Sequence, residues 1–115
     1  MNGLAHAPTV VHLLRDAAAR WPAREALVCG DERLDYTQYL GAVATFAHEL
    51  VAMGARGERV ALVLGNGLDI CIGTFAAQAA GAQVVPLNPL YTARELGQIL
   101  DDATPRVVIC DAAVE

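Results

Sequence analysis

Residues 59–89 read RVALVLGNGLDICIGTFAAQAAGAQVVPLNP. The stretch begins with an unbroken apolar run, Arg59 to Leu64, which is typical of a parallel strand covered on both faces. An almost wholly apolar helix is expected from about Leu68 to Ala80, with Gly81 closing it, and Gln83 to Leu87 follows as a second apolar strand. A strand, a helix and a second strand of this kind predict a βαβ unit, which should be right-handed.

Upstream of this unit the sequence predicts a helix followed by a hairpin. The helix has apolar residues at helical spacing, takes Thr9 as its N-cap, and ends at Trp21 because Pro22 cannot continue it. Two short runs, Glu25 to Cys29 and Arg33 to Tyr36, flank a turn that contains glycine and therefore predict an antiparallel hairpin.

Two further helices and a third parallel strand complete the predicted elements. Thr37 is expected to cap the helix after the hairpin, and Gly54 is well placed to end that helix in the left-handed conformation. Thr92 and Glu95 form a capping box for the helix that follows the βαβ unit. The apolar run from Arg106 to Cys110 then predicts another parallel strand.

The predicted fold class is therefore α/β, a partial parallel sheet with flanking helices and no internal domain boundary.

The composition indicates that this sheet is incomplete. Apolar residues make up 55% of the 115 residues and charged residues 18%, with a mean hydropathy of +0.36, against roughly 25% charged residues in ordinary soluble domains. A domain this short buries only about two-thirds of its unfolded surface. We therefore expect residues 1–115 to be one incomplete subdomain of a larger protein.

Charge argues against a nucleic-acid partner, and the sequence pattern argues against a transmembrane segment. The net charge is −5 and all eight cations are arginines scattered along the chain, so nucleic-acid binding is not expected. The interval between Asp69 and Arg94 carries no charge and would be long enough to cross a bilayer. Gly81, Pro86 and Pro89 interrupt it, however, which favours a buried helix and strand over a transmembrane segment.

Cysteine usage indicates a reducing compartment, and we expect a cytoplasmic protein. No Cys-x-x-Cys motif occurs, and the three histidines lack ligand spacing, so no metal site is expected. The three cysteines are far apart in the sequence: Cys29, Cys71 and Cys110.

Polar residues follow the three predicted parallel strands, at the edge where open α/β sheets bind ligands. These are Asn66, Asn88 and Asp111. A structural role is favoured over a ligand site, because Asn and Asp are the usual capping and turn residues. Asn66 with Asp69 resembles a capping pair, and Asn88 precedes Pro89 in a turn.

No catalytic residue is predicted in this chain. Gly65 and Gly67 match the first two glycines of a dinucleotide fingerprint, but the third position is Ile70 and residues 86–89 contain no acid for a ribose. The chain has neither lysine nor serine, which excludes a Walker loop and a serine nucleophile. A cofactor-binding residue therefore cannot be assigned from the sequence.

Several short strings occur in the order and spacing of the N-terminal segment of the acyl-adenylate-forming superfamily of AMP-dependent synthetases and ligases. The chain resembles that segment from about Val10 to Asp111. The strings are Leu34-Asp35-Tyr36-Thr37 leading to Leu40, Gly57-Glu58-Arg59-Val60-Ala61, Asn66, Gly81-Ala82, and Val85-Pro86-Leu87-Asn88-Pro89 with Thr92 and Glu95-Leu96.

The resemblance implies the beginning of the large N-terminal domain of an acyl-CoA synthetase. Such enzymes join a carboxylate to the α-phosphate of ATP, release pyrophosphate and pass the acyl group to a thiol, often that of coenzyme A. The parent enzyme would act on a fatty or aromatic acid with ATP, Mg²⁺ and coenzyme A. The family's lysine-containing loop and its late catalytic lysine would lie beyond Glu115, and Leu90 stands where some CoA ligases have an arginine.

From the resemblance we expect this fragment alone to be inactive and to bind no cofactor, with the remainder of the parent chain as its partner. Two alternatives stay open. One is a free-standing flavodoxin-like module that binds a nucleotide at the edge formed by Asn66, Asn88 and Asp111. The other is a non-catalytic interaction subunit that offers its apolar face to another chain. A fragment should aggregate or be molten, whereas a free-standing module should be monomeric and melt cooperatively.

Overall fold

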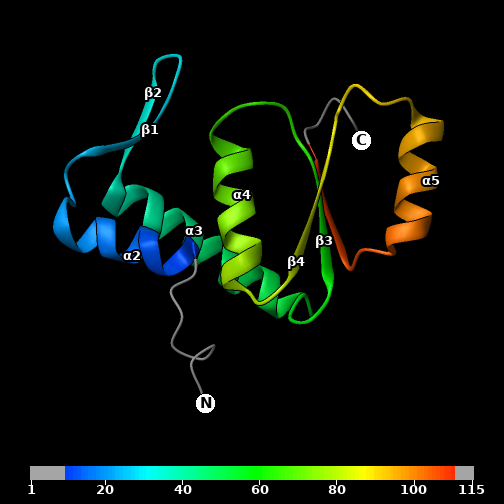
Figure 1. Ribbon diagram of the computed structural model, residues 1–115, viewed down its shortest axis with the longest axis horizontal. Coiled ribbons are helices and arrows are strands. Elements are labelled where there is room, and N and C mark those ends of the chain that lie inside the picture. The colour runs from blue at the N-terminus through cyan, green and yellow to red at the C-terminus, as the bar shows by residue number, and fades with distance from the viewer. Residues whose placement is uncertain (1–9, 111–115) are drawn as a thin grey trace. The chain divides into compact units, whose positions relative to one another are not determined.

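The computed structural model describes residues 10–110, which form four helices and five strands (Figure 1). The chain divides into two compact units, Met1–Gly41 and Ala42–Glu115, and the division falls within one helix. The elements in chain order are α2 (Val10–Arg20), β1 (Glu25–Cys29), β2 (Glu32–Asp35), α3 (Tyr36–Ala52), β3 (Arg59–Val63), α4 (Leu68–Ala79), β4 (Gln83–Leu87), α5 (Ala93–Ala103) and β5 (Val107–Cys110).

The first unit contains α2, the β1–β2 hairpin and the start of α3. The two strands pair antiparallel, as the sequence predicts, and Gly30 in their turn has a φ of 59°. Arg33 and Glu25 form an exposed ion pair across the hairpin, with an N–O distance of 2.8 Å. Leu14 and Ala18, one turn apart on α2, are both buried, so this face of the helix forms part of the unit's core.

The cap of α3 is Asp35, and the prediction of Thr37 in this role is wrong. The backbone N–H of Gln38 donates to Asp35 Oδ1 at 2.8 Å, and the backbone N–H of Asp35 donates to Gln38 Oε1 at 2.9 Å. This reciprocal pair satisfies two amides at the helix start. The Thr37 hydroxyl instead donates to the carbonyl oxygen of Pro22 at 3.2 Å. Thr9, the predicted cap of α2, lies outside the described residues.

Gly54 ends α3 in the left-handed conformation, as predicted, with a φ of 83°. The N–H of Ala55 donates to Leu50 O and the N–H of Gly54 donates to Val51 O, each at 3.0 Å. This pairing is a Schellman motif, which uses carbonyls that the helix end leaves without intrahelical partners. Gly81, with a φ of 80°, ends α4 with the same pattern of bonds.

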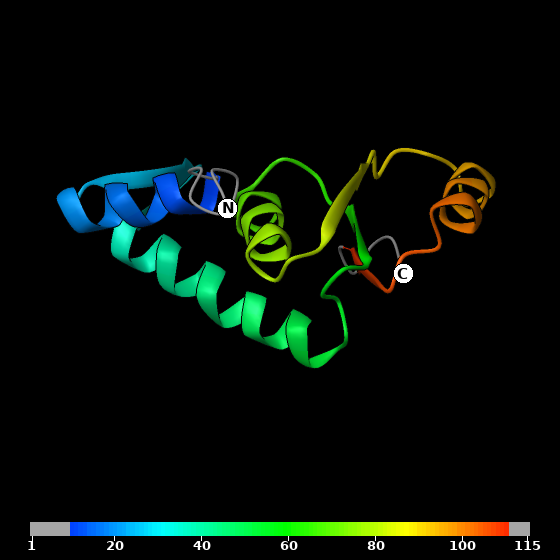
Figure 2. The same ribbon diagram turned by 60° about the horizontal axis from the view of Figure 1, so that its bottom comes forward.

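The second unit is built on a parallel sheet of three strands in the order β4-β3-β5. Val60 of the central strand is in register with Val84 on one side and Val107 on the other. Residues 60–63 of β3 are buried, as expected for a strand with cover on both faces. Helix α4 contacts β3 and β4 and lies beside them in Figures 1 and 2.

Two arginines tie helix ends to the edge of the sheet where β3 and β5 begin. Arg59 Nη1 donates to the carbonyl oxygen of Ala103, the last residue of α5, at 2.9 Å. Arg106 Nε donates to the carbonyl oxygen of Met53, just after α3, at 3.1 Å. Both bonds place a positive charge at the negative end of a helix dipole, where cations are stabilising.

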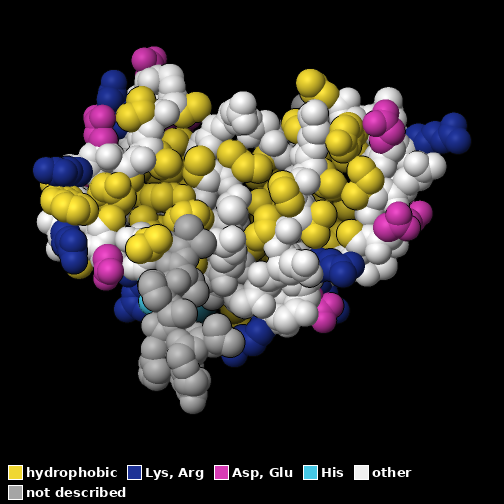
Figure 3. Space-filling model, viewed as in Figure 1, with side chains coloured by type: hydrophobic (Ala, Val, Ile, Leu, Met, Phe, Trp, Pro, Cys, Tyr) yellow, Lys and Arg dark blue, Asp and Glu magenta, His cyan; other side chains and the backbone are white. Residues whose placement is uncertain are grey.

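Apolar side chains remain exposed on each of the two units, and many of them are visible in the space-filling view (Figure 3). Helix α5 has an apolar stripe but no buried residue. The stripe consists of Leu96, Ile99 and Leu100. The exposed large hydrophobic residues among residues 10–110 are Leu13, Trp21, Val28, Val51, Met53, Leu90, Tyr91 and Val108.

The uncharged interval between Asp69 and Arg94 divides into α4 and β4, which agrees with the prediction of a helix and a strand. Across residues 10–110, no helix combines the length and the hydropathy needed to cross a lipid bilayer.

Candidate functional site

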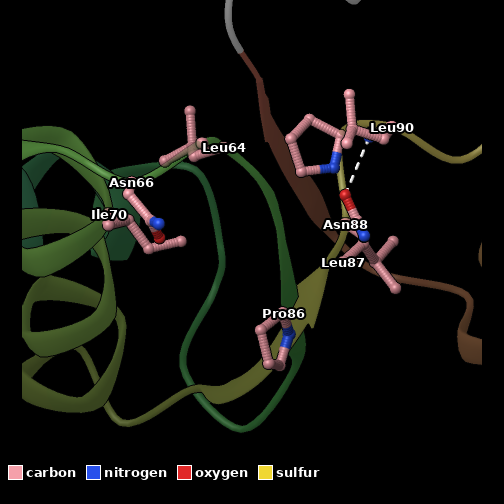
Figure 4. A pocket seen from close by; sticks show the side chains of 9 residues that line it. Leu64, Asn66, Ile70, Pro86, Leu87, Asn88 and Leu90 are labelled. Atoms are coloured by element: carbon pink, nitrogen blue, oxygen red, sulfur yellow. Dashed lines mark hydrogen bonds between the residues drawn. The ribbon is translucent and has the colours of Figure 1, made fainter.

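A groove of about 600 Å³ lies at the carboxyl ends of β3 and β4 (Figure 4). This is the edge at which ligands bind to open parallel sheets. The loop between β3 and α4 forms one wall, and the turn after β4 forms the other. The lining residues are Leu64, Gly65, Asn66, Ile70, Pro86, Leu87, Asn88, Pro89 and Leu90.

Asn88 holds the turn that follows β4. Its Oδ1 accepts a hydrogen bond from the backbone N–H of Leu90 at 2.9 Å, and its carbonyl oxygen accepts one from the N–H of Tyr91 at 3.1 Å. A side-chain oxygen that bonds to the backbone two residues on defines an Asx turn. The predicted turn role of Asn88 is confirmed, while the residue also lines the groove.

Asn66 does not cap α4, so its predicted role in a capping pair with Asp69 is wrong. The helix begins at Leu68, its N-cap is Gly67, and no side chain caps it. Gly67 has a φ of 168°, an extended conformation that separates Asn66 from the first helical turn. Asp69 lies in that turn, where its negative charge stabilises the helix by interacting with the positive end of the helix dipole. Asn66 is exposed and lies across the groove from Asn88 (Figure 4).

The structure brings together two of the three polar residues predicted at the strand ends. Asp111, the third, lies outside the described residues. The last described residue of β5, Cys110, is in register with Val63 of β3, so both strands end at the same edge of the sheet. Cys29, Cys71 and Cys110 are each half-buried and form no disulfide.

The groove is chemically neutral. Its lining consists of apolar side chains, two asparagine amides and one glycine, without an ionisable side chain. These residues can hold an uncharged group by packing and amide hydrogen bonds, but they provide no acid, base, nucleophile or cation. Within residues 10–110, no group of His, Cys, Asp and Glu side chains could hold a metal ion.

Sequence reasoning missed the apolar part of the groove. In the sequence, Ile70 stands out only as a break in a glycine fingerprint and Leu90 only as a departure from a family pattern, yet both line the groove. Helical spacing could have placed Ile70, because it lies in the first turn of α4 and therefore near the end of β3.

The two asparagines should respond differently to removal of their amides. Asn88→Ala is expected to lower the free energy of unfolding by about 0.5–1.5 kcal/mol, because the turn loses its side-chain hydrogen bond. Asn66→Ala should change it by less than about 0.5 kcal/mol, as is usual for an exposed position. Urea unfolding followed by circular dichroism measures both values. Equal losses in the two variants would contradict the assignment of the turn to Asn88.

A parallel sheet with a groove at its carboxyl edge defines the class of open α/β proteins that bind ligands at that edge. The comparison with protein families is more specific. The family model described as "AMP-binding enzyme" matches residues 14–115, and the chain belongs to this family. The mixed α/β fold agrees with that of the N-terminal domain of acyl-CoA synthetases.

Three similar proteins illustrate the range of the family. The chain is 38% identical over 96 residues to the phosphinothricin tripeptide synthetase PhsC of Streptomyces viridochromogenes, covering 83% of this chain and 9% of the synthetase. Its fold matches a fatty acyl CoA synthetase of Mycobacterium tuberculosis with a TM-score of 0.85 and 34% identity, covering 91% of this chain and 22% of that protein. It also matches O-succinylbenzoate coenzyme A synthetase of Bacillus subtilis, solved with ATP and a magnesium ion, with a TM-score of 0.82 and 25% identity, covering 89% of this chain and 28% of that one. The chain thus spans less than a third of each of these relatives.

Proposed function

We propose that residues 1–115 form the first part of the large N-terminal domain of an ATP-dependent acid–thiol ligase that works through an acyl-adenylate. The observation that carries this proposal is the family match over residues 14–115. In this reading the chain supplies scaffold, namely the β3–α4–β4 unit and the strand β5, and it is inactive alone. Its partner is the remainder of the parent chain, and the parent is a cytoplasmic enzyme.

The proposed substrate is a fatty or aromatic carboxylic acid, and the proposed acceptor is the thiol of coenzyme A. Similarity to a fatty acyl CoA synthetase supports the first kind of acid, and similarity to an O-succinylbenzoate synthetase supports the second. The similarity to a tripeptide synthetase supports a different substrate and acceptor, namely an amino acid and a thiol bound to a carrier protein.

Enzymes of this family use ATP and Mg²⁺, but the groove at the ends of β3 and β4 does not fit a nucleoside triphosphate with its metal ion. Moving phosphate charge needs cations close to the phosphates, and the groove is lined by apolar and amide side chains only. We therefore assign no step of the reaction to residues 10–110. The proposal instead places the lysine-containing loop and the catalytic lysine of the enzyme beyond Glu115.

Pyrophosphate release tests the proposal. The 115-residue chain, given Mg²⁺, ATP and fatty or aromatic acids, is expected to release pyrophosphate at the rate of a protein-free control. The polypeptide that the reading frame encodes beyond Glu115 is expected to release it only when an acid is present. Acid-dependent release by the 115-residue chain would refute the scaffold role. Failure of the longer polypeptide with every acid, amino acids included, would refute the ligase.

One alternative is a free-standing nucleotide-binding module, which the place of the groove at the carboxyl edge of the sheet favours. Equilibrium dialysis of the chain against AMP and flavin mononucleotide separates the two functions. Saturable binding that is lost in Asn66→Ala would support the module, whereas the scaffold role predicts no binding by the chain alone.

A further inference from the structure

Arg20, Trp21 and Arg24 form an exposed cluster at the end of α2, here named the arginine–tryptophan cluster. The guanidinium carbons of Arg24 and Arg20 lie 5.2 Å and 6.0 Å from the centre of the Trp21 ring, within the range of cation–π attraction. Trp21 is 41% exposed. Neither arginine has an acidic partner among residues 10–110. The cluster therefore presents two positive charges that form no ion pair within residues 10–110, around an accessible indole.

Leu13 extends the cluster along α2. It precedes Arg20 by seven residues and Trp21 by eight, the spacing that places side chains on one face of a helix. The helical turn continues to Trp21, because its N–H donates to Ala17 O at 2.8 Å. Leu13 is 59% exposed. At the end of α2, Figure 3 shows hydrophobic side chains between groups of arginine side chains.

We propose that the face of α2 formed by Leu13 and the arginine–tryptophan cluster docks onto the surface of an anionic lipid bilayer. An indole prefers the boundary between headgroups and acyl chains, and a guanidinium binds lipid phosphate through several N–H groups. The face of α2 that carries Leu14 and Ala18 is buried within the unit, so the helix would meet the bilayer only through its exposed Leu13, Arg20 and Trp21 and would stay at the level of the headgroups. The proposal goes beyond the ligase function and does not depend on it.

The negative net charge of the chain does not prevent this contact. Screening limits the reach of exposed charges to about 8 Å at physiological salt, so only acids near the cluster oppose binding. Asp16, one turn before Arg20 on α2, is one of these. Glu25 follows Arg24 directly, but its carboxylate is bound by Arg33 at 2.8 and 3.0 Å.

Trp21 is the only tryptophan in the chain, so intrinsic fluorescence reports on the cluster directly. Vesicles of phosphatidylserine and phosphatidylcholine should shift the Trp21 emission to shorter wavelength and carry the chain with them in sedimentation. Vesicles of phosphatidylcholine alone should do neither. Each basic residue near an anionic surface changes binding by about five-fold. Arg20→Gln with Arg24→Gln should therefore weaken vesicle binding about twenty-five-fold, and added salt should release the wild-type chain.

A second double variant, Arg56→Gln with Arg94→Gln, is the matched control. It removes the same charge from exposed positions of the other unit, and it should change vesicle binding by less than about two-fold. Circular dichroism checks that both double variants are folded. Equal binding to neutral and anionic vesicles, or an equal loss in the two double variants, would overturn the proposal. So would binding to soluble polyglutamate in the absence of vesicle binding, because it would assign the cluster to an acidic protein partner.

Discussion

Leu62→Ala is expected to lower the free energy of unfolding of the chain by about 2–5 kcal/mol, the range for truncating a large buried aliphatic side chain. Leu62 lies in the central strand of the parallel sheet and has no exposed surface. Its Cδ2 is 3.5 Å from the position that a Cβ on Gly73 of α4 would take, so the side chain fills the space between strand and helix. The variant would leave a cavity there. Urea unfolding at low protein concentration measures the loss.

Val108→Ala is the matched control for this effect. Val108 belongs to β5 of the same sheet but is 45% exposed at the edge, so its truncation should cost less than about 1 kcal/mol. A loss at Leu62 no larger than that at Val108 would show that β3 is not the centre of the core.

The order of elements could be predicted because each one depends on local chemistry. The apolar runs of β3, β4 and β5 need no distant information to be recognised as parallel strands, although only β3 is buried by the elements of this chain. Gly54 and Gly81 end their helices in a conformation that other residues rarely adopt. The cap of α3 could not be chosen this way, because Asp35 and Thr37 are both good caps. The contact of Thr37 with Pro22, fifteen residues away, decided between them.

The groove shows the same division between local and distant causes. The role of Asn88 follows from a turn within three residues, and the sequence predicts it. Asn66 sits in a loop whose geometry depends on how α4 packs on β3 and β4, so the capping motif assigns to Asn66 a position that Gly67 takes, although the helix start near Leu68 is predicted correctly. The apolar wall that Ile70 and Leu90 provide exists only once β3 and β4 are neighbours.

The chain as a whole presents more apolar surface than its own elements cover. Leu90 is 87% exposed, and Met53, Val28 and Val108 each keep about half of their surface accessible. Helix α5 has no buried residue. Contiguous exposed apolar surface usually marks a contact with another protein or with more of the same chain. In the proposed function, the remainder of the ligase domain makes this contact.

Self-association of the purified chain is the second large effect that we expect, and its measurement tests the central claim most directly. Sedimentation velocity over a range of concentrations should give an average mass well above the 12.1 kDa of one chain, rising with concentration. Leu90→Gln with Val108→Thr should lower that mass, because both positions carry exposed apolar surface. The contradicting result is an average mass of 12.1 kDa, that of one chain, at every concentration.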